Sequence, residues 1–497
     1  MKKIKDNFKL KKGYVILFLI LVAGFVLRIY QPAQLFMYGH DQDLAGWFVK
    51  DVVVNKHLRL IGQETSTQGI FIGPVYYYML IPFYLLFEMD PIGGVLFVTL
   101  LGMFSIVSVY YVLTQVYGKK EGLIASFVYA VSFYTVFNDR EVVPTMPVIV
   151  WTVWFFYGLD LLLKGRQKKA FAVLGILVGL IWHLNMALAL LVPLILLSLY
   201  LSKEKLDFKK LRSGLIYAGV LLFPLALFEI KHGFSQTKWF VKSLTTHQYA
   251  EISGYEQFMR VIHLLSKNAS ALVWGSFDSL SYETTLILFA AVFVFLVSVK
   301  KIKKTHAYLL ISWILLYVGF FTMYSKNISE YYLNGTILVW IVIFTLGISH
   351  LISKKDTKIA GRVVIFVFLL LNLDKFARLE VNKISYLERR ATVAEIKRDA
   401  ETRGYPCVSV SYITNPGYDF GYRYFFFLED MHVNRPKSNS PVYTIVFPLR
   451  DDIKVDRTFG ALGLIYPDYD IYLMEKVKVS CSGENENLTE PLWGFTQ

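Results

Sequence analysis

Residues 92–116 read IGGVLFVTLLGMFSIVSVYYVLTQV and contain no charged side chain. An α-helix rises about 1.5 Å per residue, so about 20 apolar residues cross the hydrocarbon layer of a membrane. This stretch is therefore predicted to span a bilayer. Further apolar blocks follow the same pattern at 13–30, 70–88, 121–137, 145–163, 170–182, 186–201, 213–229, 284–299, 306–323, 331–350 and 359–373.

The composition of the whole chain agrees with a membrane protein. Hydrophobic residues make up 55% of the sequence and charged residues 18%, against about 25% charged in typical soluble domains. The net charge of +14 would favour nucleic acid in a soluble protein. Here much of the positive charge lies in short loops between apolar blocks, so we expect contact with membrane lipid and no nucleic-acid partner.

The basic loops predict the orientation. Positive loops remain in the cytoplasm. All six basic segments lie on the cytoplasmic side if 70–88 makes no net crossing and 170–201 forms two short spans. Gly73, Pro74 and Pro82 suit a broken or re-entrant helix at 70–88. The pattern then predicts eleven crossings within a polytopic α-helical protein of about 11 to 13 membrane helices, with a cytoplasmic N-terminus. The six basic segments are 2–12, 119–120, 164–169, 203–212, 300–304 and 354–362.

The predicted domains follow from this orientation. Residues 1–373 form the transmembrane domain, with outer loops at 31–69 and 230–283, and residues 374–497 form an extracytoplasmic α/β or α+β domain. That domain should hold a helix over 382–403 and strands at CVSVSYI, YTIVF and DIYLME. Cys407 and Cys481 both lie in it, and they either form a disulfide or are buried separately.

Polar residues gather at the predicted outer ends of several spans. Asp41 and Asp43 follow the first span, where capping of a helix N-terminus is the alternative to a chemical role. Further clusters lie at 137–144, 183–185, 229–233 and 324–332. Ionisable groups at membrane spans are costly and point to function.

These clusters suit chemistry on a lipid-linked sugar. A polyprenyl-phosphate donor keeps its chain in the bilayer and its sugar outside. Transfer with inversion needs a carboxylate base for the acceptor's proton, and the departing phosphate needs Lys, Arg or a divalent cation. The outward clusters supply both kinds of group.

The order of motifs resembles a known family. It runs from GHDQDLAGWFVKDV through LRLIGQETS and GIFIGPVYYY to NDREVVP, GILVGLIWHLN, FEIKHGF and EYY. This order is similar to prokaryotic members of the protein-mannosyltransferase/aminoarabinose-transferase superfamily, the glycosyltransferases of family 39 with the GT-C fold. The resemblance covers about residues 13–373 and implies a GT-C fold in the prokaryotic plasma membrane.

The resemblance also implies site residues. Asp41 matches the presumed catalytic base, and Asp41 with Asp43 would hold a divalent cation, Mg²⁺ or Mn²⁺, if one is used. Gln42 stands where the family often has an acid, and Ile72–Val75 replaces a family segment that carries an acid or base. The expected substrate-binding residues are Asp43, Glu64, Arg140, Glu141, His183, Lys231, His232, Lys326, Glu330 and Tyr331.

The expected activity is inverting transfer of one sugar from a polyprenyl-phosphate donor to a glycan, lipid or protein acceptor on the outer face. Two other classes remain open: a transporter or flippase for lipid-linked sugars, and a non-catalytic protein of envelope assembly. A transporter would more often show a two-fold repeat, and the sequence shows none.

Overall fold

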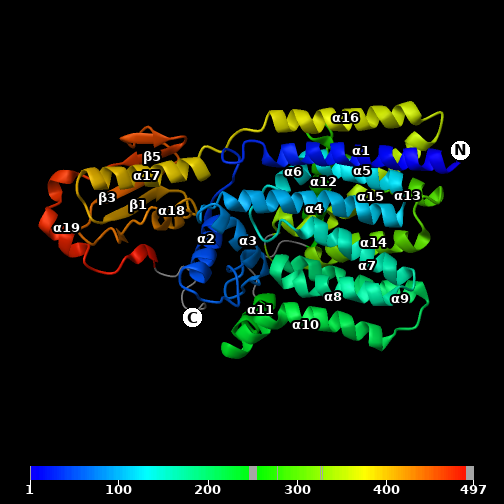
Figure 1. Ribbon diagram of the computed structural model, residues 1–497, viewed down its shortest axis with the longest axis horizontal. Coiled ribbons are helices and arrows are strands. Elements are labelled where there is room, and N and C mark those ends of the chain that lie inside the picture. Colours follow the sequence, from blue (N-terminus) through cyan, green and yellow to red (C-terminus); the bar gives the residue numbers. More distant parts are fainter. Residues whose placement is uncertain (1, 246–253, 277, 325, 327, 489–497) are drawn as a thin grey trace.

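The computed structural model describes residues 2–245, 254–276, 278–324, 326 and 328–488. Figure 1 shows a helical bundle with a smaller α/β unit at one end, and the N-terminus lies at the opposite end. The helices of the bundle are α1 (Lys2–Ile29), α4 (Gly93–Val116), α5 (Lys119–Val131), α6 (Phe133–Asn138), α7 (Val148–Leu163), α8 (Gln167–Leu184), α9 (Pro193–Ser202), α10 (Phe208–Lys231), α13 (Tyr282–Ser298), α14 (Lys304–Met323), α15 (Ile337–Ser353) and α16 (Lys358–Ala377).

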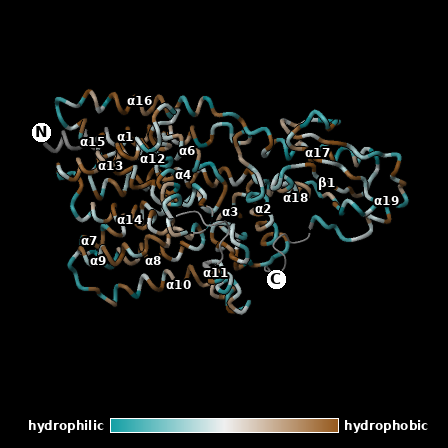
Figure 2. Tube along the Cα trace, turned by 180° about the vertical axis from the view of Figure 1, so that it is seen from behind, coloured by the Kyte–Doolittle hydropathy of each residue, from teal (hydrophilic) through white to brown (hydrophobic). Residues whose placement is uncertain are grey.

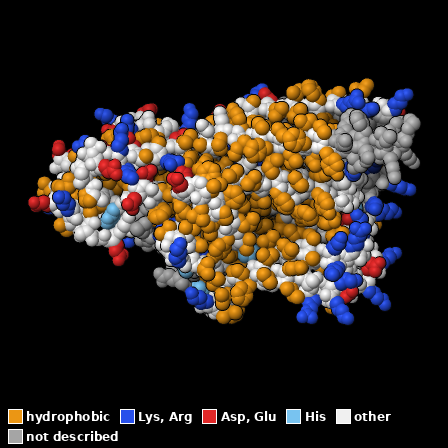
Figure 3. Space-filling view, in the orientation of Figure 1, with side chains coloured by type: hydrophobic (Ala, Val, Ile, Leu, Met, Phe, Trp, Pro, Cys, Tyr) orange, Lys and Arg blue, Asp and Glu red, His pale blue; other side chains and the backbone are white. Residues whose placement is uncertain are grey.

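The bundle has the surface of a membrane protein. Figure 2 shows hydrophobic residues along the helices and hydrophilic ones at their ends. In Figure 3 a broad apolar band covers the bundle, and Lys and Arg gather at the end away from the α/β unit. Within the described residues, five helical segments are long and apolar enough to cross a membrane alone: Gly93–Val116, Gln167–Leu184, Phe208–Lys231, Lys304–Met323 and Glu330–Ser353.

The segment 70–88 contains the short helix α3 (Val75–Leu86). Its start lies beside the end of α8, where the backbone N–H of Val75 donates to His183 Nδ1 at 3.4 Å. Its end leads to Asp90, which accepts a hydrogen bond from Tyr386 of the α/β unit at 2.8 Å. Both ends of α3 therefore lie at the end of the bundle that carries the α/β unit. That 70–88 makes no net membrane crossing stays a prediction.

Two other outer segments are helical. The first outer loop holds α2 (His40–Val53), and the second holds α11 (Ser235–Thr245) and α12 (Gly254–Trp274). Val261, Leu265, Ala269 and Leu272 form a buried stripe on α12 at helical spacing. Its ends contact the outer ends of α14 and α16 through Gln257 and Val273. The region predicted as an outer loop is thus partly a helix packed across the end of the bundle.

The stretch predicted to turn at 183–185 does so. Helix α8 ends at Leu184, and the side chain of Asn185 caps the 3-10 helix η1 (Met186–Leu191) by accepting from Ala187 N–H at 2.9 Å. Helix α9 continues the return path. The second 3-10 segment of the bundle, η2 (Glu330–Thr336), leads directly into α15 at the outer end.

The α/β unit follows α16. Its mixed five-stranded sheet has the order β2-β1-β3-β5-β4, with β1 parallel to β2 and β3, and β5 antiparallel to β3 and β4. The register pairs Ser409 with Val442 and Ile445 with Leu464. Its elements are α17 (Tyr386–Thr402), β1 (Val408–Thr414), α18 (Arg423–Leu428), β2 (Val433–Asn434), β3 (Val442–Phe447), β4 (Arg457–Phe459), β5 (Leu462–Ile465), η3 (Tyr469–Ile471), α19 (Met474–Ser480) and η4 (Glu486–Leu488).

The α/β unit shares one apolar core with α2 and α3. Phe36, Tyr38 and Trp47 pack in the same buried cluster as Tyr386 and Phe425. The ring centroids of Tyr38 and Phe425 are 4.6 Å apart. The unit is therefore fixed to the outer surface of the bundle by packing as well as by the chain.

Sequence expectations for this unit hold in part. The predicted helix and the first two strands correspond to α17, β1 and β3. The strand predicted at DIYLME is wrong, because this stretch forms η3 and the start of α19. Cys407 and Cys481 form a disulfide, with Cα atoms 5.5 Å apart.

Candidate active site at the outer end of the bundle

Asp41 lies in the first turn of α2, at the edge of the membrane bundle. Gly39 N–H donates to Gln42 Oε1 at 2.9 Å, which caps the helix start. Gln42 Nε2 also donates to the carbonyl of Val142 at 3.4 Å. The start of α2 and the 138–144 turn, which are about 100 residues apart in the chain, therefore meet directly.

The Asp41 side chain is exposed to solvent, yet nearby protein raises its pKa. Burial is the main cause, and the charge of His40 and a hydrogen bond from Gln63 oppose it. A carboxylate can contact water and still have a raised pKa when protein atoms surround it on its other sides. Asp41 can therefore meet a substrate and accept a proton from it.

Glu141 is the second acid of this site. Burial raises the pKa of its carboxyl to about 7, and the charge of Asp41 adds to the shift. At neutral pH Glu141 is therefore divided between its protonated and ionised forms.

The 3-10 helix η2 completes the wall. Tyr331 interacts electrostatically with Asp41, and the Tyr332 hydroxyl lies 3.0 Å from Ser66 Oγ. Glu330 pairs with Lys267 of α12 at 2.6 Å. The start of α2, residues 63–66, the 138–144 turn, η2 and α12 thereby come together. The sequence analysis did not select Lys267. The signal that could have found it is its place on α12, on the face opposite the buried apolar stripe.

Lys326 lies between α14 and η2 and is only 8% exposed. Burial lowers the pKa of its ammonium. Among the described residues, no carboxylate lies within ion-pair distance of Lys326. Burying an ammonium is costly unless an anion pairs with it, so this position suits an anionic group of a substrate.

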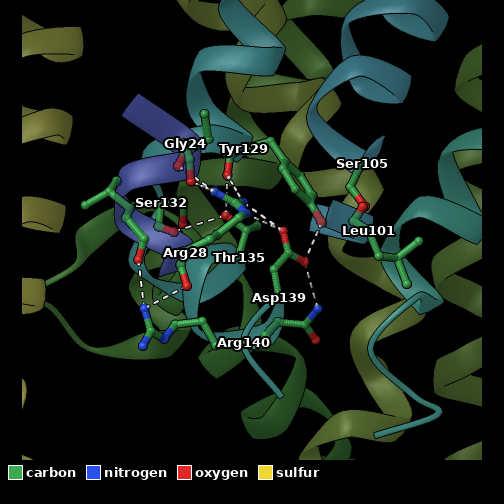
Figure 4. Close-up of polar contacts among 12 residues, drawn as sticks. Gly24, Arg28, Leu101, Ser105, Tyr129, Ser132, Thr135, Asp139 and Arg140 are labelled. Carbon is green, nitrogen blue, oxygen red and sulfur yellow. Dashed lines mark hydrogen bonds and ion pairs between the residues drawn. The ribbon is translucent and has the colours of Figure 1, made fainter. Parts of the chain in front are cut away.

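Arg140 lies beside the carboxyl end of α1. Its guanidinium donates to the carbonyls of Leu27, Arg28 and Tyr30 at 3.0, 2.9 and 2.8 Å, at the end of α1. Figure 4 shows Arg140 beside Arg28. Burial lowers its pKa to about 10, and the nearby charge of Arg28 adds to the shift. The side chain thus caps the carboxyl end of α1, and the role expected for Arg140 at a substrate phosphate stays a prediction.

Its neighbour Asp139, which we did not select, forms a buried ion pair. Asp139 Oδ2 accepts from Arg28 Nη2 at 2.7 Å and from Nε at 2.9 Å, and both side chains are fully buried (Figure 4). The Tyr129 hydroxyl donates to Oδ1 at 2.9 Å. This network joins α1, α5 and the 138–144 turn behind the site.

Asp43 does not join Asp41 either. Its Oδ1 accepts from Tyr424 N–H at 3.0 Å and from the Tyr38 hydroxyl at 3.2 Å, inside the core shared with the α/β unit. Burial raises its pKa to about 6. Asp43 therefore has different surroundings from Asp41, and the metal pair expected from these two carboxylates stays a prediction. No group of three or more His, Cys, Asp or Glu side chains suited to a metal occurs within the described ranges.

Other expected residues have structural contacts. Glu64 Oε1 accepts from Gly69 N–H and closes the 64–71 turn, where Glu64 also bridges to Phe71. His183 is buried, with Nε2 2.9 Å from the carbonyl of Leu221. A Cβ at Gly73 would meet the His183 ring at 2.0 Å, so the ring holds the start of α3.

Lys231 and His232 lie at the outer end of α10. His232 stacks on Phe228 with ring centroids 4.1 Å apart, and its Nδ1 is 2.9 Å from the carbonyl of the same residue. Lys231 is exposed. The substrate-binding roles expected for Lys231 and His232 stay predictions.

Comparisons with known proteins agree with this architecture. Residues 72–230 match the profile of the family described as dolichyl-phosphate-mannose-protein mannosyltransferase. No curated protein matches the chain in sequence.

Two solved structures are similar in fold. ArnT from Cupriavidus metallidurans, bound to undecaprenyl phosphate, gives a TM-score of 0.62 at 10% identity over 93% of this chain and 99% of that one. The oligosaccharyltransferase AglB from Archaeoglobus fulgidus, in complex with an inhibitory peptide and a dolichol-phosphate, gives 0.52 at 13% identity over 88% and 70%. The expected resemblance is therefore confirmed: the chain has the GT-C fold of these membrane glycosyltransferases, and its residues 72–230 carry the sequence pattern of the protein-mannosyltransferase family.

Proposed function

We propose that this protein is an inverting glycosyltransferase that takes a sugar from a polyprenyl-phosphate donor on the outer face of a prokaryotic plasma membrane. The observation that carries the proposal is the solvent-exposed carboxylate of Asp41 beside Glu141, where outer segments of the bundle converge. The solved structures of similar fold contain undecaprenyl phosphate and a dolichol-phosphate, which supports a lipid-linked donor.

In the proposed reaction Asp41 removes the proton from the attacking group of the acceptor. The acceptor forms a bond to the anomeric carbon, and the bond from that carbon to the donor phosphate breaks. The polyprenyl phosphate leaves with the electron pair. A raised pKa makes the Asp41 carboxylate a stronger base than an ordinary aspartate.

The departing phosphate requires positive charge. Lys326, which is buried without a described carboxylate partner, is the first candidate, and Lys267 is the second because Glu330 already pairs with it. The neutral form of Glu141 can donate to a sugar hydroxyl or a phosphate oxygen. Tyr331 offers an aromatic face beside Asp41.

The residues present can hold a divalent cation only if a bound substrate supplies further ligands. Mg²⁺ and Mn²⁺ accept one or two protein carboxylates when substrate phosphate and water supply the other ligands. Asp41 and Glu141 would hold such an ion, and it would neutralise the phosphate. Asp43 is not included, because its contacts are to the α/β unit.

The proposal includes an orientation of the protein in the membrane. The basic end faces the cytoplasm and the α/β unit faces outward. The Cys407–Cys481 disulfide supports this, since such bonds persist outside the reducing cytosol. The acceptor, a glycan, lipid or protein, would approach from that side.

The test is a transfer assay in membranes with Asp41→Asn. Loss of a general base should lower turnover by about 10²- to 10⁴-fold while the unfolding midpoint stays unchanged. Asp419→Asn is a matched control, because Asp419 lies near His40 and interacts with it electrostatically. Near-normal turnover of a folded Asp41→Asn protein would disprove the base assignment.

Release of polyprenyl phosphate by the purified protein separates the proposal from the other classes. A transporter or flippase moves its substrate without cleaving the sugar–phosphate bond, and an assembly protein does neither. Product formation that depends on Asp41 supports transfer, and movement of intact donor without product contradicts it.

A further inference from the structure

A cavity of about 710 Å³ lies at the opposite end of the bundle from the candidate active site. Residues of α1, α5 and α16 line it. Figure 1 shows these three helices side by side at the end of the bundle where the N-terminus lies. Its wall is largely apolar, with Ile16 and Ile20 from α1, Phe127 from α5 and Ile365 from α16. Ligand cavities commonly measure about 300–1,000 Å³, so this space is large enough for a hydrocarbon chain.

The cavity opens onto the apolar surface of the bundle. Helices α1 and α16 approach each other at their outer ends, where the rings of Tyr30 and Phe376 are 5.7 Å apart. Towards the basic end, Phe127 of α5 and its neighbours form the floor between them. Ile16 is 39% exposed, so the lining continues into the apolar surface of α1. A lipid chain can enter from the side without crossing the bundle.

Lysines border the same cavity. Lys119 and Lys120 line it at the start of α5. Lys120 Nζ donates to the Ser349 carbonyl and to Ser353 Oγ, both at 2.8 Å, which leaves one of its three donors for another group. Lys119 is exposed and forms no ion pair within the described residues.

The charge around these lysines favours an anion. Lys301 and Glu121 interact electrostatically with Lys120, and Lys354 acts with Lys120 and Lys301 on His350. Glu121 is the carboxylate of this group, and the Ser349 hydroxyl donates to it at 2.6 Å. Among these described groups, lysine therefore outnumbers acid at the basic end of the bundle.

We propose that this cavity binds one phospholipid with an anionic headgroup from the membrane leaflet on the basic side. Lys119 and the remaining donor of Lys120 contact the phosphate, and one acyl chain lies between α1 and α16 on Phe127. Anionic lipids are attracted to basic clusters beside membrane spans by about 1 kcal/mol per lysine. The site is separate from the proposed catalysis, and it does not depend on the sugar transferred.

The test uses delipidated full-length protein in detergent, titrated with phosphatidylglycerol or phosphatidylcholine and followed by native mass spectrometry. We expect one phosphatidylglycerol to bind more tightly than phosphatidylcholine. Lys119→Gln should weaken phosphatidylglycerol binding roughly fivefold, the equivalent of one lysine. Lys355→Gln is the matched control, since Lys355 is exposed at the same end and does not line the cavity.

A second pair of variants tests the acyl chain. Ile16→Trp should fill the cavity and weaken binding of both lipids, whereas Val15→Trp, at an exposed neighbouring position outside the lining, should not. Equal binding of the two lipids, or equal effects within either pair of variants, would overturn the proposal. Displacement of the bound phosphatidylglycerol by undecaprenyl phosphate would also overturn it, because the cavity would then hold a prenyl chain.

Discussion

Asp41 and Asp43 lie two residues apart in the first turn of α2, but their surroundings differ. Asp41 meets solvent and interacts with Glu141, whereas Asp43 is buried and accepts hydrogen bonds from Tyr424 and Tyr38. Successive residues in a helix are rotated by about 100°, so two positions carry a side chain to nearly the opposite face. One face of α2 therefore forms the candidate site, and the other holds the α/β unit.

The 138–144 turn repeats this division. Glu141 faces Asp41, and Asp139 is buried against Arg28. The candidate site thus contains Asp41 from α2 and Glu141 from the 138–144 turn. The other acid of each segment, Asp43 or Asp139, is buried and fixes that segment in place. Substituting the two site acids should change activity, and substituting the two buried acids should change stability.

The largest effect on stability is expected for Asp139→Asn. Removing one partner of a buried ion pair leaves the other charge uncompensated, which typically costs about 3–5 kcal/mol. Thermal or denaturant unfolding of the protein in detergent measures the loss. Asp374→Asn is the matched control, because its ion pair with Arg378 is exposed and should contribute about 0–1 kcal/mol. Equal losses in the two variants would contradict the division between buried and exposed acids.

Asp43→Asn should change how stability depends on pH. The folded-state pKa of about 6 lies above the ordinary value of 3.8, so the folded protein favours the protonated form. This contribution is full below pH 3.8 and is lost as pH rises through about 6, by up to about 3 kcal/mol. Asparagine stays neutral and can still accept from Tyr424. The stability of the variant relative to wild type should therefore increase between pH 4 and pH 7; a constant difference would contradict the burial of Asp43.

Glu141→Gln should have the smallest effect. Glutamine keeps a hydrogen-bond donor, so transfer should fall by about 1 kcal/mol in transition-state stabilisation, roughly fivefold. The sharper measurement is the pH–rate profile: a change near pH 7 in the wild type should disappear in the variant, because the pKa of about 7 belongs to Glu141. The fall in rate at acid pH, which reports Asp41, should remain in both. A profile identical to wild type would remove Glu141 from the site.

Much of the fold could be predicted because membrane spans have a strong sequence signal. Apolar length identified the bundle, and the polar interruption at His183–Asn185 identified the end of α8. The non-crossing path of 70–88 stays a prediction. Helix α12 was missed because its sequence is amphipathic and mixed with charge, which resembles an outer loop. The strand expected at DIYLME failed because alternation over a few exposed residues does not separate a strand from a 3-10 turn.

The site was less predictable than the fold. The sequence indicated that Asp41 and the turn near 140 would meet, and Gln42 and Val142 are in contact. It could not indicate which acid of each segment would face solvent, because that depends on the packing of Tyr424 and Arg28, far away in the chain. Nor could it show that Arg140 caps α1, since the capped carbonyls belong to the backbone.

The core that α2 and α3 share with the α/β unit has a consequence for building chimeras of this protein. Phe36, Tyr38 and Trp47 follow the first helix of the bundle, but packing partners such as Tyr386 and Phe425 lie beyond α16. Exchanging only the chain after α16 for that of another protein would pair foreign side chains with these rings. A functional graft must therefore transfer both chain segments together, the stretch from about residue 31 to 90 and the α/β unit, as one piece built from two distant parts of the gene.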